Sequence, residues 1–298
     1  MIQVSDVTKT FDQFTALSRL NLHVRKGSIY GLVGTNGSGK TTVLKHITGV
    51  YRPDSGTITI EDLPVYDNPA LKSRIGFISD DLSFFAPYTL KSLSQFYKAI
   101  YPNWNSERFS HMIALFKLSE KRKLGRFSKG MQKQAAFALT MASLPDYLIL
   151  DEPIDGLDPI VRKLIWKFIL EDVADREMTV LVSSHNLKEM EGVCDSIGIL
   201  NHGEMIIERD LDELKSDIHK VQVAFSPEVE PDYSGLNLLH KESRGSVDLL
   251  IVRNTKETVE EVLKRNHPIL FDLLPLSLEE IFIYELGGGN SEIESILF

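Results

Sequence analysis

The sequence predicts an α/β fold, in which a largely parallel sheet is covered by helices. Three stretches are continuously apolar rather than alternating: YGLVG at 30–34, YLILD at 147–151 and TVLVSS at 179–184. Such runs are typical of strands that are buried on both faces. Helical patterns at 40–49 and 160–173 alternate with these strands. Alternation of strands and helices indicates an α/β domain.

Other segments complete this outline. Further strands are expected at MIQVSDV (1–7), LNLHV (20–24), GTITI (56–60), RIGFIS (74–79) and SIGIL (196–200). Residues 86–146 carry mostly helical patterns, which predicts a helical insertion between two strands of the sheet. From 211 to 286, helix and strand patterns restart as a small α+β unit. The last twelve residues, 287–298, begin with three glycines, and we expect a flexible tail there.

Charge separates the two parts of the chain. Residues 1–210 contain 25 acidic and 25 basic side chains, whereas residues 211–298 contain 17 acidic and 8 basic ones. The whole net charge of −9 therefore lies in the C-terminal part. A broad nucleic-acid surface needs a basic patch, so we expect no nucleic-acid partner. The shift also predicts a domain boundary near residue 210.

The chain has the features of a cytoplasmic protein. It contains one cysteine, so no disulfide can form within it, which fits a reducing compartment. Its first residues lack the basic and then apolar pattern of a signal peptide. No apolar stretch approaches the roughly 18 residues of a membrane helix. Any membrane role is therefore expected to depend on a partner.

One glycine-rich loop predicts phosphate binding. GTNGSGKTT at 34–42 matches the pattern G-x-x-x-x-G-K-[ST], follows the apolar run IYGLV and precedes a helical pattern. In this context backbone N–H groups and a helix N-terminus surround phosphates, the lysine reaches the β- and γ-phosphates, and the hydroxyl after it can ligate Mg²⁺. The candidate nucleotide-binding residues are Gly34, Thr35, Asn36, Gly37, Ser38, Gly39, Lys40, Thr41 and Thr42.

Two carboxylates follow a second apolar strand. Asp151 ends the run YLILD, at the edge of an α/β sheet where ligands bind. With Thr41 it is a candidate Mg²⁺ ligand. Glu152 follows directly, and we expect it to orient and deprotonate the water that attacks the γ-phosphate.

The order of these motifs resembles the nucleotide-binding subunits of ATP-binding cassette (ABC) transporters over roughly residues 1–210. The phosphate loop is followed by FSKGMQKQ (127–134), LILDEPIDGLDP (148–159) and SSH (183–185). Gly130 precedes Asp151 by 21 residues, which agrees with the family spacing. The resemblance implies a P-loop NTPase core with a mixed sheet and a helical subdomain at about 86–146. It also implies an ATPase that uses ATP and Mg²⁺.

Further roles come from this resemblance alone. Phe11 matches the aromatic residue that stacks on adenine, with a plain core phenylalanine as the alternative. His185 matches the histidine that contacts the γ-phosphate, with a structural histidine as the alternative. Asp158 matches the loop that crosses the dimer interface. Ser128 and Gly130 match the signature element that closes over the ATP of a second subunit.

The sequence departs from the family at three positions. Lys129 replaces the first glycine of the signature element LSGGQ, and Met131 replaces its glutamine. Lys129 could meet a phosphate or face solvent. Asp80 stands where the family usually has a glutamine, after the strand that precedes the helical insertion. A carboxylate there could touch the Mg²⁺ shell through water, so Asp80 is a candidate metal residue.

The leading hypothesis is an ATPase subunit that powers a membrane transporter. Two copies, or one copy and a homologous partner, would enclose two ATP molecules and move integral membrane subunits. The aromatic loop near Asp80–Tyr88 is either the docking site for those subunits or buried in the helical subdomain. The protein would lie on the cytoplasmic face of the cell membrane. Through LSLEEIF at 276–282 and its order of strands and helices, the C-terminal unit resembles a small domain appended to some bacterial ABC ATPases, often on the export side. This resemblance favours an exporter.

Two other functions are alternatives to this hypothesis. A non-transport ABC ATPase of DNA repair, chromosome organisation or translation usually has a long coiled coil, two cassettes or a basic surface. This chain has one cassette, a short insertion and an acidic C-terminal part. A nucleotide-dependent regulatory module would not need turnover, whereas Glu152 and His185 favour hydrolysis.

Overall fold

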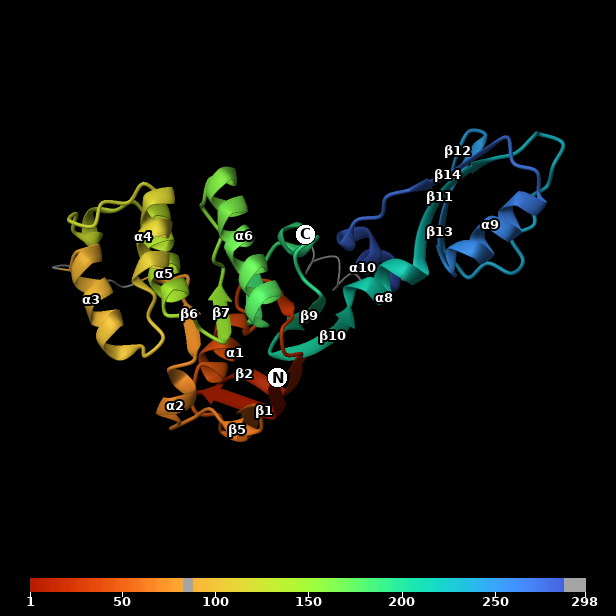
Figure 1. The fold of residues 1–298 in the computed structure, drawn as a ribbon. Coiled ribbons are helices and arrows are strands. Elements are labelled where there is room, and N and C mark those ends of the chain that lie inside the picture. Colours follow the sequence, from red (N-terminus) through yellow and green to blue (C-terminus); the bar gives the residue numbers. More distant parts are fainter. Residues whose placement is uncertain (83–87, 287–298) are drawn as a thin grey trace. The chain divides into compact units, whose positions relative to one another are not determined.

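The computed structural model describes residues 1–82 and 88–286 (Figure 1). Two of the expectations above concern residues outside these ranges. The expected flexible tail, 287–298, lies outside the described residues. Most of the expected aromatic docking loop, 83–87, also lies outside them.

The chain divides into two compact units. The first consists of Met1–His185 and Ser196–Glu208, and the second of Asn186–Asp195 and Arg209–Phe298. The segment Asn186–Asp195 differs from the expected division at residue 210. It contains α7 (Leu187–Met190), whose two end residues are buried. This helix contacts α10 of the second unit, which explains why the segment belongs there.

A six-stranded sheet forms the centre of the first unit. In sheet order its strands are β10 (Glu204–Asp210), β9 (Ser196–Asn201), β3 (Ile29–Val33), β8 (Thr179–Ser184), β7 (Tyr147–Asp151) and β6 (Ile75–Ile78). The pairs from β9 to β6 are parallel. Every residue of β3, β7 and β8 is buried, as their continuous apolar runs predicted.

A second, four-stranded sheet lies in the same unit. Its order is β2 (Phe14–Val24), β1 (Ile2–Phe11), β4 (Ser55–Ile60) and β5 (Leu63–Pro64). The pairs β1–β2, β1–β4 and β4–β5 are antiparallel. The first unit thus combines parallel and antiparallel strand pairs with helices, and its fold class is α/β, as predicted. Strands β1 and β2 are longer than expected, because their outer halves carry polar residues that hide the strand pattern.

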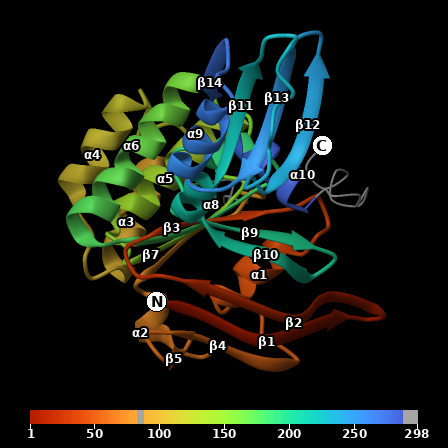
Figure 2. The same ribbon diagram turned by 90° about the vertical axis from the view of Figure 1, so that its right-hand side faces the viewer.

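Helix α1 (Lys40–Ile47) packs between these two sheets (Figure 2). It contacts β7 of one sheet and β2 and β4 of the other. Its apolar residues Val43, Leu44 and Ile47 belong to one continuous core with residues of both sheets. The helix that follows the phosphate loop is therefore held on two sides, which fixes the position of the loop.

The helical insertion lies between β6 and β7, which are neighbours in the sheet. Its α-helices gather in one cluster in Figure 1. A one-turn 3₁₀ segment at Leu124–Arg126 precedes the last of them. The α-helices are α3 (Leu90–Ile100), α4 (Ser106–Leu115) and α5 (Lys129–Ala142). Each begins after a capping side chain, Thr89, Asn105 or Ser128, that accepts a hydrogen bond from the first turn. The first unit also contains α2 (Pro69–Lys72) and α6 (Pro159–Arg176).

The second unit is an α+β unit, as predicted. Its antiparallel sheet has the order β12 (Leu238–Arg244), β13 (Val247–Arg253), β11 (Ile218–Ala224) and β14 (Leu270–Leu274). Helix α9 (Lys256–Arg265) packs on it, burying Val259 and Leu263 against β11 and β13. Two more helices are α8 (Leu211–Asp217) and α10 (Leu278–Leu286). Strand β12 was not predicted, since this edge strand is mostly exposed and polar.

Candidate nucleotide-binding site

The phosphate loop connects β3 to α1 at residues 34–39. Gly34 comes so close to the main chain that a Cβ there would lie 2.3 Å from the Leu200 carbonyl oxygen. Gly39 adopts a φ of 110° directly before the helix, and its Cβ would lie 2.8 Å from the Ala16 carbonyl oxygen. Both positions therefore require glycine. The loop lies at the N-terminus of α1, where N–H groups without helical partners favour anions.

Lys40 folds back over the loop. Its side chain is 6% exposed, and its Nζ donates to the carbonyl oxygens of Gly34 at 2.7 Å and Thr35 at 3.1 Å. The Nζ also lies 3.6 Å from Oε1 of Glu152. Burial lowers the pKa of Lys40, and the charge of Glu152 opposes that shift. The ammonium is thus held at the loop with a carboxylate beside it.

Asp151 is a buried carboxylate with a hydroxyl on each oxygen. The Thr41 hydroxyl donates to Oδ2 at 2.8 Å, and the Ser183 hydroxyl donates to Oδ1 at 2.7 Å. Asp151 and Ser183 are paired across the parallel strands β7 and β8. Threonine hydroxyl and aspartate oxygens are hard ligands of the kind that Mg²⁺ uses together with phosphate oxygens. The residues at this position therefore fit Mg²⁺.

Mg²⁺ does not require a dedicated cage of protein ligands. Within residues 1–82 and 88–286, His, Cys, Asp and Glu side chains form no group of three or more that could hold a metal ion. A site built from Thr41 and Asp151 would need nucleotide phosphate to complete it.

Glu152 lies between the phosphate loop and His185. Its Oε2 is 3.0 Å from Nδ1 of His185, and its Oε1 faces Lys40. The Glu152 side chain is 15% exposed, whereas that of His185 is 49% exposed. The main chain at Glu152 has a φ of 47°, in the left-handed region. The structure therefore brings Lys40, Glu152 and His185 together, although up to 145 residues separate them in the sequence.

Lys40 and Glu152 line a cavity of about 300 Å³, whereas Asp151 and His185 are not among its lining residues. Its lining is formed by Phe14, Ala16, Asn36, Gly37, Gly39, Lys40, Thr41, Thr42, Asp80 and Glu152. Asp80 thus lies at the same cavity as the phosphate loop. Within the phosphate loop, the Ser38 N–H donates a hydrogen bond to the Thr35 carbonyl oxygen.

Phe11 is not among the residues that line this cavity. Its ring packs edge-on against Tyr51, with centroids 5.5 Å apart, and Lys9 lies over it. Phe14, its partner across the β1–β2 turn, lines the cavity and is 63% exposed. Sequence reasoning missed Phe14; its place three residues after Phe11 in a hairpin was the available signal.

Ser128, Gly130 and Asp158 do not line the phosphate cavity. The Ser128 hydroxyl caps α5 and accepts from the Met131 N–H at 3.3 Å. Gly130 lines a second cavity of about 330 Å³, which shares Asp80 with the first. Asp158 caps α6 and accepts from the N–H groups of the next two helical residues after Pro159. Within one chain, Ser128 and Asp158 thus have local structural partners.

Two further residues at the site were missed by sequence reasoning. Ser183 holds Asp151 through its hydroxyl and accepts from the Glu152 N–H at 3.2 Å. Lys133, on α5, is ion-paired with Asp80 at 3.0 Å. Serine at the end of an apolar strand and lysine within a helical run carry no motif signal by themselves, and only their contacts reveal them.

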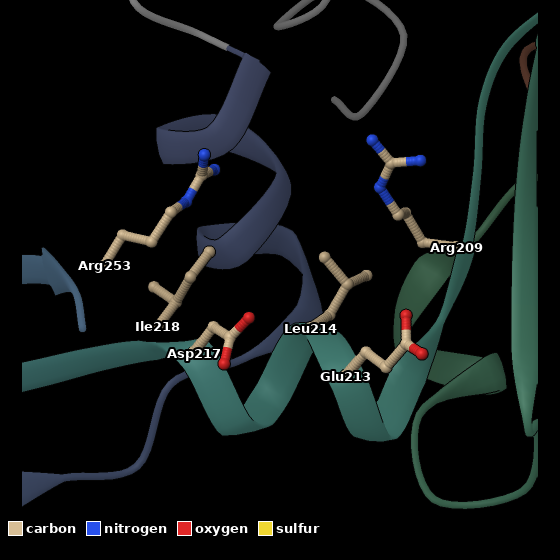
Figure 3. Close-up of a pocket in the computed structure, with 6 residues that line it drawn as sticks. All are labelled: Arg209, Glu213, Leu214, Asp217, Ile218 and Arg253. Carbon is tan, nitrogen blue, oxygen red and sulfur yellow. The ribbon is translucent and has the colours of Figure 1, made fainter. Parts of the chain in front are cut away.

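The second unit has a pocket of its own, with a volume of about 170 Å³. Figure 3 shows its lining residues, which come from α8 and the neighbouring strand ends: Arg209, Glu213, Leu214, Asp217, Ile218 and Arg253. The two arginines and two acids balance in charge around two aliphatic side chains. None of the predicted nucleotide-binding residues belongs to this pocket.

The described part of the chain contains no helix with the length and apolar character of a membrane span.

Several known proteins are similar to this chain in sequence and in fold. Residues 17–155 match the family described as ABC transporter. The chain is 32% identical to the ABC transporter ATP-binding protein YtrB of Bacillus subtilis, over 97% of this chain and 99% of that protein.

Two further similarities agree with this match. The chain is 29% identical to the bacitracin transport ATP-binding protein BcrA of Bacillus licheniformis, over 97% of this chain and 98% of that protein. A solved ATP-binding subunit of an ABC transporter superposes with a TM-score of 0.67 at 25% identity, covering 72% of this chain and 92% of that chain. The chain therefore belongs to the ATP-binding proteins of ABC transporters, the subunits that hydrolyse ATP in these assemblies.

Proposed function

We propose that this chain binds MgATP at the cavity beside Lys40 and hydrolyses it to drive transport by integral membrane subunits. The observation that carries this proposal is that Lys40, Thr41 and Glu152 line one cavity. Asp151 is hydrogen-bonded to Thr41, and His185 lies beside Glu152. Lys40 would exchange its two loop carbonyls for the β- and γ-phosphates. Thr41 and Asp151 would hold Mg²⁺, which neutralises charge on the phosphates.

In the same proposal Glu152 is the general base. Its carboxylate lies 3.0 Å from His185 and beside Lys40, so it can accept a proton from water while both neighbours contact the γ-phosphate. Asp80 at the cavity wall would contact the Mg²⁺ shell through water. Phe11 or its neighbour Phe14 would stack on the adenine.

The remaining motif residues are assigned to a second subunit's ATP. Ser128, Gly130 and Asp158 do not line the phosphate cavity of their own chain, which supports a dimer that encloses two ATP molecules. The N-terminus of α5 would meet the γ-phosphate held by the partner. The subunit can be paired with a copy of itself or with a homologue.

Transport out of the cell is the proposed task. The similar proteins include a bacitracin transport and a lantibiotic transport ATP-binding protein, which supports a related cargo. The proposed ABC ATPase domain is 1–210, followed by an accessory domain at 211–286. The protein would be cytoplasmic and peripheral at the inner face of the cell membrane, held there by its membrane partners.

The test is Glu152→Gln, assayed for phosphate release and for dimerisation by light scattering. Loss of the base should abolish turnover while ATP binding stays intact, so that an ATP-bound dimer accumulates. Ser128→Arg in this background should prevent that dimer without weakening nucleotide binding. Unchanged hydrolysis by Glu152→Gln would refute the general base, and a normal dimer with Ser128→Arg would refute the role across the interface.

A further inference from the structure

Lys133 is a buried cation with all of its donors in use. It lies on the second turn of α5 and is 8% exposed. Its Nζ donates to Oδ1 of Asp80 at 3.0 Å, to the Glu152 carbonyl oxygen at 2.8 Å and to the Asp155 carbonyl oxygen at 3.1 Å. An ammonium has three N–H donors, so this set is complete.

These three partners lie on segments that the sheet brings together. Strands β6 and β7 are parallel neighbours, with Ile78 opposite Leu150. Asp80 and Glu152 each lie two residues beyond that pair, at the same edge of the sheet, and both line the phosphate cavity. Lys133 joins both segments to the helix that begins with the signature element.

We propose that Lys133 is a positioning residue for ATP hydrolysis, which holds the main chain at Glu152 and so aims the Glu152 carboxylate. The inference rests on the proposed function of Glu152 as the general base. Lys133 itself is not among the residues that line the phosphate cavity. It acts on the reaction through Glu152.

The main chain at Glu152 needs to be held. Its φ of 47° lies in the left-handed region, which is costly for a residue with a Cβ and persists only where neighbouring groups enforce it. The Glu152 N–H donates to Ser183, and the Glu152 carbonyl accepts from Lys133. Hydrogen bonds on both sides of the residue thus fix the direction in which its carboxylate leaves the chain.

Asp80 supplies the charge that balances the Lys133 ammonium. A buried ammonium needs a counter-charge, and the Asp80 carboxylate provides it at 3.0 Å. The Asp80 side chain is 55% exposed, so it would remain solvated without its partner. Charge compensation therefore comes from Asp80, whereas positioning comes from the two hydrogen bonds to main-chain carbonyls.

The experiment separates these two contributions. Steady-state ATP hydrolysis, affinity for a fluorescent ATP analogue and thermal unfolding are measured on the full chain. The variants are Lys133→Met, Lys133→Arg and the exchanged pair Asp80→Lys/Lys133→Asp. Lys167→Met is the matched control, because Lys167 is 69% exposed and its ion pair with Glu171, at 3.8 Å, lies at the surface.

Lys133→Met should lower kcat by about 10²-fold, the order that a displacement of about 1 Å costs in a catalytic site. The affinity for the nucleotide analogue should change little, because the phosphate loop is untouched. Lys133→Arg, which keeps N–H donors, should recover most of kcat. The exchanged pair should remain slow, because it restores opposite charges but offers the carbonyls no donor at position 133. Lys167→Met should behave as wild type.

Full activity of the exchanged pair would overturn the proposal, since the ion pair alone would then suffice. A parallel loss of nucleotide affinity and thermal stability with Lys133→Met, without recovery by Lys133→Arg, would overturn it as well. If Lys133→Met does not fold, Lys133→Arg decides: near wild-type kcat supports the proposal, and a kcat lowered by about 10²-fold overturns it. Turnover by Glu152→Gln would instead refute the proposed base, independently of Lys133.

Discussion

Ser183→Ala should destabilise the protein more than an ordinary serine truncation. The Ser183 hydroxyl is completely buried, donates to Asp151 and accepts from the Glu152 N–H. A hydrogen bond to a charged group contributes roughly 1.5–3 kcal/mol, and a buried N–H left without a partner costs about 1–3 kcal/mol. Partial relaxation around the alanine offsets some of this sum. We therefore expect the free energy of unfolding to fall by about 3 kcal/mol.

Differential scanning calorimetry measures this effect. For a domain of about 150–250 residues, 1 kcal/mol corresponds to roughly 2–4 °C, so the midpoint should fall by on the order of 10 °C. Ser143→Ala is the matched control, because Ser143 is also buried but its hydroxyl donates to a main-chain carbonyl, that of Thr140 in the helix it follows. The free energy of unfolding of Ser143→Ala should fall by about 1 kcal/mol. If the two midpoints fall equally, the Ser183 network does not stabilise the site as argued.

Two further predictions concern charge and base stacking. Hydrogen bonds from Arg74 and Tyr147 lower the pKa of Glu61 from 4.5 to about 2. The contribution of Glu61 to stability is therefore complete above pH 4.5 and is lost as the pH falls towards 2. Glu61→Gln should lower the urea midpoint at pH 7 but hardly at pH 2. An equal shift of the midpoint at the two pH values would contradict this prediction. Phe14→Ala should weaken nucleotide binding by about 1–3 kcal/mol if Phe14 stacks on the base. Titration calorimetry measures this affinity. If only Phe11→Ala weakens nucleotide binding, the stacking belongs to Phe11 instead.

Much of the fold could be predicted because its signals are local. The buried strands β3, β7 and β8 are continuous apolar runs, and the helical insertion follows from periodicity. Strand β12 was missed because it lies at a sheet edge, where most of its side chains face solvent. The assignment of Asn186–Asp195 to the second unit was also missed, since it depends on a helix contact with α10.

The sequence by itself determined the phosphate loop, since Gly34, Gly39 and Lys40 act within one short turn where spacing decides geometry. It also placed Asp151 and Glu152 at the end of a buried strand. Only the tertiary structure decided that Lys133 meets Asp80 and the Glu152 main chain, 53 and 19 residues away. The physical reason is that strand order in the parallel sheet brings β6 and β7 side by side across the helical insertion. Contacts of that kind depend on how the whole chain packs, and no local pattern of residues specifies them.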